Sequence, residues 1–146
     1  MNRAQKTAWF TLVTLAMALG LSVAAFGIGY FIFGAPARRA AAGFGFIGIM
    51  GFSALAPLLF KKDKDKVQLD ERDLLIKRRA MLGAYSIFWP LFVLAAMVPF
   101  FVVGPNGTIP VVYLPWMVFG GMFVVMLVQA IVTLEEYGWP GKGGKS

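Results

Sequence analysis

Charged side chains are the residues of this chain with the most capacity for chemistry, and most of them lie in one run. The stretch KKDKDKVQLDERDLLIKRRA, from Lys61 to Ala80, holds thirteen of the 21 charged residues, and five of these are acids. A surface of mixed sign suits a protein partner, because pairing of both signs fixes the register of a contact. The chain has no cysteine and no histidine, which removes thiol nucleophiles, haem ligation and most transition-metal sites. We therefore expect no enzyme activity and no cofactor.

The charged run divides into a linker and the start of a helix. Residues 61–66 alternate in sign without an apolar side chain, which is typical of a solvated linker. Asp70 suits a helix N-cap, Glu71 and Asp73 place negative charge in the first turn, and Asp73 is four residues from Lys77. The pattern predicts a helix from about Asp70 that continues into the next apolar stretch. The candidate partner-docking residues are Asp70, Glu71, Arg72, Asp73, Lys77, Arg78 and Arg79.

Two other interpretations of this run stay open. In one, the charges only fix the topology of the chain and hold its two halves in register. In the other, the lysines and arginines next to the apolar stretch attract anionic lipid headgroups, at about 1 kcal/mol each. The five acids weaken the lipid interpretation.

Long apolar stretches surround the charged run. They cover about 8–33, 40–60, 80–103 and 111–134, and about 20 apolar residues in a helix cross the hydrocarbon of a bilayer. Apolar residues do not alternate with polar ones, so barrel strands are a poor alternative. We expect an all-α integral membrane protein with four transmembrane helices, arranged as two hairpins. The charged cytoplasmic segment 61–79 would join them within a single membrane domain, 1–146.

The distribution of basic residues predicts the orientation. Twelve of the fourteen Lys and Arg residues lie in the two terminal segments and the charged run, and only Arg38 and Arg39 lie elsewhere. Because basic residues gather on the cytoplasmic side, both termini are expected in the cytoplasm of a cell (inner) membrane. Nucleic-acid binding is not expected, since no recognition module accompanies the positive charge. Ser22-Val23-Ala24 resembles a signal cleavage site, but the apolar run continues to Phe33, which favours an uncleaved span.

The predicted spans contain polar and small residues that suit helix packing. Small residues let helices approach closely in lipid, and Gly45, Gly48 and Gly51 recur every three residues. They would pack within the first hairpin or against another subunit. Gln129 could donate a hydrogen bond across to another helix. The spans carry no ionisable residue, which is unlike a coupled transporter. The chain resembles the small four-helix drug-efflux proteins in span number, but it lacks their carboxylate in the first helix.

A short motif resembles one found in small prokaryotic membrane proteins. In DERDLLIKRRA, the sequence D-E-R is followed by Ile four residues after the Arg, and then by Lys or Arg and Ala. The matching positions are Asp70, Glu71, Arg72, Ile76, Arg79 and Ala80. The families that share this motif are uncharacterised, so the resemblance implies a bacterial or archaeal membrane protein and transfers no activity.

These observations predict a small non-enzymatic membrane protein that acts through contacts. It would be an accessory subunit of a membrane complex, or a regulator that uses its cytoplasmic loop. Its partners would be the lipid bilayer and another membrane or cytoplasmic protein, or a second copy of itself. The alternative is a small oligomeric transporter or channel.

Overall fold

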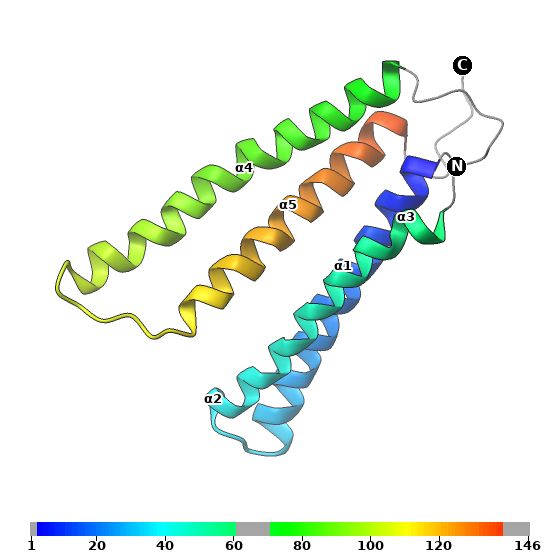
Figure 1. Cartoon of the computed structure of the whole chain (residues 1–146). Coiled ribbons are helices and arrows are strands. Elements are labelled where there is room, and N and C mark those ends of the chain that lie inside the picture. Colours follow the sequence, from blue (N-terminus) through cyan, green and yellow to red (C-terminus); the bar gives the residue numbers. More distant parts are fainter. Residues whose placement is uncertain (1–2, 61–70, 139–146) are drawn as a thin grey trace. The chain divides into compact units, whose positions relative to one another are not determined.

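The computed structural model describes residues 3–60 and 71–138, and every regular element in these two ranges is a helix (Figure 1). The chain divides into two compact units, Met1–Lys64 and Asp65–Ser146. The predicted linker 61–66 and the predicted N-cap Asp70 lie outside the described residues. The all-helical prediction is confirmed.

The first unit begins with α1 (Arg3–Gly27), which continues as a π-helical turn, η1 (Ile28–Ile32). The helix starts five residues before the predicted span because Arg3 to Thr7 hold no helix breaker. Its buried side chains lie on one helix face, in rows whose members are three, four or seven residues apart. They are Ala8, Thr14, Leu15, Ala18 and Ser22.

The chain then turns at Gly34, whose φ of 60° favours glycine, and returns along α1. The return arm contains α2 (Ala37–Ala40), a 3₁₀ helix η2 (Ala41–Leu55) and α3 (Ala56–Leu59). The sequence predicts one helix over 40–60, and the structure places most of that range in 3₁₀ form. In a 3₁₀ helix, residues three apart lie above one another. Accordingly, Met50, Ser53 and Ala56 are buried in one row, whereas Gly45, Gly48 and Gly51 are exposed in another.

Contacts join the two arms of the first unit at both ends. At the turn end, a Cβ built on Gly43 would lie 2.7 Å from the backbone nitrogen of Phe26. One built on Gly29 would lie 3.5 Å from Ala40 Cα. At the other end, Arg3 Nε donates a 2.6 Å hydrogen bond to the carbonyl oxygen of Phe60. The rings of Phe10 and Phe60 also meet edge to face, with centroids 6.0 Å apart.

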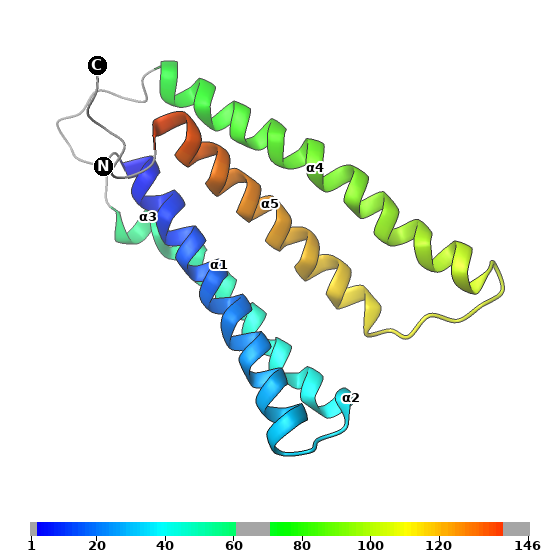
Figure 2. The same ribbon diagram turned by 180° about the vertical axis from the view of Figure 1, so that it is seen from behind.

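The second unit contains α4 (Glu71–Val103) and α5 (Tyr113–Tyr137). The two helices run side by side in both views (Figures 1 and 2). Small and aliphatic residues fill the seam between them, and its buried members are Ile76, Ala80, Ala84, Ala130 and Leu134. Gly121 leaves room for the ring of Phe88, which a Cβ there would approach to 2.7 Å. Tyr113 also donates a 2.6 Å hydrogen bond to the carbonyl oxygen of Ala95.

Three helices of the described chain are long and apolar enough to cross a membrane. They are Arg3–Ile32, Glu71–Val103 and Tyr113–Tyr137, and Ala41–Leu55 is a shorter apolar helix. The third of the predicted spans extends further than its apolar stretch, because α4 includes the charged turns before Ala80. The fourth crossing and the hairpin topology in a membrane stay predictions.

Candidate functional site

The first three turns of α4 carry six of the seven predicted docking residues. The helix begins at Glu71, and Glu71 and Asp73 place their charge in its first turn. Negative charge there is favourable, because the backbone N–H groups at a helix start are unpaired and carry partial positive charge. The prediction of a helix that continues from these turns into the apolar stretch is confirmed from Glu71 onward.

Two of the predicted docking residues pair with side chains of α5. Arg79 forms an ion pair with Glu136, with Nη1 and Oε1 3.2 Å apart. The Tyr137 hydroxyl donates a hydrogen bond to the Asp73 carboxylate. The expected i, i+4 pair is not formed, since no described ion pair joins Asp73 to Lys77. The Asp73 and Tyr137 positions are 64 residues apart, so helix spacing alone could not reveal their contact.

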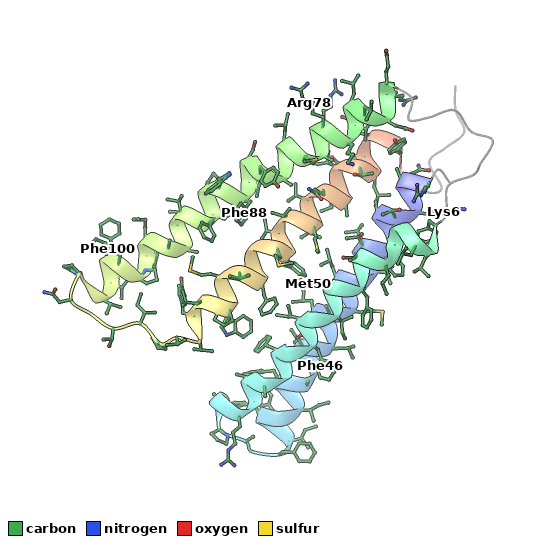
Figure 3. The ribbon with its side chains drawn as sticks, viewed as in Figure 1. Lys6, Phe46, Met50, Arg78, Phe88 and Phe100 are labelled. Carbon is green, nitrogen blue, oxygen red and sulfur yellow. The ribbon has the colours of Figure 1, made fainter. Side chains whose placement is uncertain are left out.

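The remaining charges stay on the surface of α4. Glu71, Arg72, Lys77 and Arg78 are exposed. Arg78 points away from α5 (Figure 3). These four side chains provide one carboxylate and three cations, which can pair with charges of either sign on a partner.

Two leucines lie among these charges. Leu74 is 50% exposed and Leu75 is 54% exposed, whereas the neighbouring Ile76 is buried against α5. Sequence reasoning missed the leucines because the apolar pair stands within a charged run. A helical wheel would have revealed that Leu75 is exposed. At 100° per residue, Leu75 falls near Glu71 and Arg78, on the side of α4 opposite the buried Ala80. We define the outer surface of α4 as Glu71, Arg72, Leu74, Leu75, Lys77 and Arg78.

Three of the predicted helix-packing residues, Gly45, Gly48 and Gly51, lie on η2 in the first unit. A Cβ built on Gly45, Gly48 or Gly51 would meet no atom within 4 Å. Within the described part of the first unit, the close approach between helices therefore falls at Gly43 and not at Gly48. The prediction that the three glycines pack against another subunit is not tested.

Gln129 is half-buried on α5. Its backbone carbonyl accepts a 2.7 Å hydrogen bond from the Thr133 hydroxyl. Its side chain makes no hydrogen bond to another helix within 3–60 and 71–138. The same ranges contain no group of three or more His, Cys, Asp or Glu residues that could hold a metal ion. The side chains on the outer surface of α4 can form charge pairs and apolar contacts.

Comparison with known proteins gives a family and no further relative. No curated protein and no solved structure matches the sequence. The model of a family described as predicted membrane proteins matches residues 4–134, which cover most of both compact units and all of the charged run. The match covers most of the chain, and apolar helices of membrane-spanning length occur in both units. The chain therefore belongs to the DUF2178 family of predicted membrane proteins.

Proposed function

We propose that this protein works by binding another protein through the outer surface of α4, as an accessory subunit or a regulator. In this proposal both termini and the charged run lie in the cytoplasm. The support for this orientation is that twelve of the fourteen Lys and Arg residues lie in these three segments. Basic residues in short loops are retained on the cytoplasmic side during insertion.

The proposed topology also needs the return arm of the first unit to cross the membrane. Ala41–Leu55 has only fifteen residues. A 3₁₀ helix rises about 2.0 Å per residue, so these residues extend about 30 Å, which is the thickness of the hydrocarbon core. The 3₁₀ form thus gives a short segment enough length to span.

The exposed leucines carry the proposal. Lys77, Arg78 and Arg79 precede the apolar part of α4 and are expected at the headgroups. Leu75 lies five residues before Ala80, about 7.5 Å further along the helix, and the headgroup layer is itself only about 5–7 Å thick. Leu74 and Leu75 therefore stand at the outer edge of the headgroups. An apolar centre with a charged rim is the usual arrangement of a protein interface.

The internal pairs support a rigid surface. Arg79–Glu136 and Asp73–Tyr137 connect the first turns of α4 to the end of α5, and Ile76 is buried between them. A surface held in one conformation loses less entropy when it binds. The charged turns would therefore present fixed positions to a partner.

A charge exchange on the outer surface tests the proposal. Glu71→Arg combined with Arg72→Glu keeps the net charge and the number of basic residues, so insertion should be unchanged. Asp73 is left in place because it accepts a hydrogen bond from Tyr137. The matched control, Arg79→Glu with Glu136→Arg, exchanges the charges of an internal pair. Epitope-tagged proteins would be purified from mildly solubilised native membranes, and the copurifying proteins would be compared.

We expect the wild type and the control to retain a defined partner and the outer-surface variant to lose most of it. In the outer-surface variant, like charges would face each other at the contact with the partner. If all three proteins recover the same partners in the same yield, the charged run is only a topological anchor and the proposal is wrong.

The alternative of an oligomeric transporter or channel has less support. The described helices carry no Asp, Glu, Lys or Arg from Thr7 to Phe33 or from Ala80 to Leu134. Ionisable residues inside the membrane are the usual elements of ion and proton pathways. Substrate-dependent flux in proteoliposomes would favour this alternative.

A further inference from the structure

The two arms of the first unit differ in residue number although both ends are joined. Arg3 contacts Phe60 at one end, and Gly29 lies against Ala40 at the other. Twenty-six residue steps separate Arg3 from Gly29, but only twenty separate Ala40 from Phe60. The return arm must therefore cover nearly the same length with six fewer residues.

The 3₁₀ form of η2 compensates for this shortage. At an α-helical rise of 1.5 Å, the α1 arm extends about 39 Å and an all-α return arm would extend only about 30 Å. With fifteen residues at about 2.0 Å, the return arm reaches about 37.5 Å. An all-α return arm would therefore fall about 9 Å short of the level of Arg3, and the 3₁₀ form supplies about 7.5 Å of this length.

Opposing preferences act on η2. A 3₁₀ helix has poorer hydrogen-bond geometry than an α-helix, and runs beyond three or four residues are uncommon and often mark a strained sequence or a hinge. The backbone of η2 therefore favours the α form. The hydrogen bond between Arg3 and Phe60 opposes it, as does the buried row that includes Met50 and Ser53.

We propose that η2 is a length-changing element with two forms. It is a stretched 3₁₀ helix while Phe60 is held against α1, and it shortens to an α-helix when Phe60 is released. Shortening moves Phe60 about 7.5 Å toward the turn at Gly34. Because the charged run follows Phe60 directly in the sequence, a force on that run and the form of η2 are mechanically coupled.

Spin labels at residues 42 and 54 report the length of η2 directly. The chain has no cysteine, so Ala42→Cys and Ala54→Cys would provide unique labelling sites, and both alanines are exposed. Their backbones are about 24 Å apart in a 3₁₀ helix and about 18 Å apart in an α-helix. Pulsed dipolar spectroscopy in lipid nanodiscs resolves this difference. We expect the labelled parent protein to show the longer distance.

A release variant tests the role of the contacts at Phe60. Arg3→Ala with Phe10→Ala removes both partners of Phe60, and we expect a population at the shorter distance. The matched control is Lys6→Ala with Val13→Ala, because both residues are exposed on the same helix. The control should retain the longer distance. A release variant that retains only the longer distance would overturn the proposal.

An insertion variant tests the proposal without removing any contact. Six residues, Ala-Leu-Ala-Ala-Leu-Ala, would be inserted between Leu55 and Ala56, so that an α-helical return arm can reach from Ala40 to Phe60. We expect the shorter distance between the labels. If the insertion variant keeps the longer distance, the local sequence alone sets the 3₁₀ form and the proposal is wrong. This variant decides the question if the release variant does not fold.

Discussion

Gly43 occupies the tightest interhelical position described in the first unit. A Cβ there would lie 2.7 Å from the nitrogen of Phe26 and 2.9 Å from the carbonyl carbon of Ala25. Both are backbone atoms of α1, so no side-chain rotation can relieve the overlap. Gly48 lies five residues later on the same helix and has nothing within 4 Å. Substitutions at these two positions therefore distinguish the effect of interhelical packing from the effect of helix preference.

We predict that Gly43→Ala lowers the free energy of unfolding by about 1–3 kcal/mol, because the two helices must move apart. Gly48→Ala should be neutral or stabilising by up to about 1 kcal/mol, because Ala favours a helix more than Gly. Thermal unfolding of both variants in the same detergent measures the difference. Equal losses of stability would show that the close approach at Gly43 is not formed.

At the scale of elements, the start of α4 could be predicted and the form of η2 could not. Acids in the first turn act locally, so Glu71 and Asp73 were sufficient to indicate the helix. The three-residue repeat of Gly45, Gly48 and Gly51 is visible in the sequence and indicates small-residue packing. The same range is also a 3₁₀ helix, which the repeat alone does not indicate. In our proposal the 3₁₀ form of η2 depends on the length of α1, which lies on the opposite arm. The pairing of Asp73 with Tyr137 likewise depends on how α4 lies against α5.

The seam between α4 and α5 is held more strongly by its buried residues than by its ion pair. Leu134 is fully buried, and we predict that Leu134→Ala destabilises the protein by about 2 kcal/mol or more. The side chains of Arg79 and Glu136 are 67% and 32% exposed, so Arg79→Ala should cost less than about 1 kcal/mol. Unfolding of the two variants by denaturant in mild detergent compares these losses. A larger effect at Arg79 would contradict this account of the seam.

At the scale of the whole molecule, the charge distribution predicts four crossings with both termini inside. Cysteines placed singly at residues 5, 65, 106 and 143 would be labelled in sealed membranes with an impermeant thiol reagent. We predict labelling from outside at residue 106 alone, because the loop near Asn106 contains no basic residue to retain it in the cytoplasm. External labelling at residue 65 would overturn the proposed topology.

The central claim is that the outer surface of α4 binds a protein, and site-specific photocrosslinking in native membranes tests it most directly. A photoreactive amino acid would replace Leu75, within that surface, or Val98, which is similarly exposed on the apolar part of the same helix. We predict a discrete protein adduct at position 75 that is absent at position 98. The adduct should be lost when Glu71→Arg and Arg72→Glu are added. No adduct at position 75, or the same adducts at both positions, would contradict the claim.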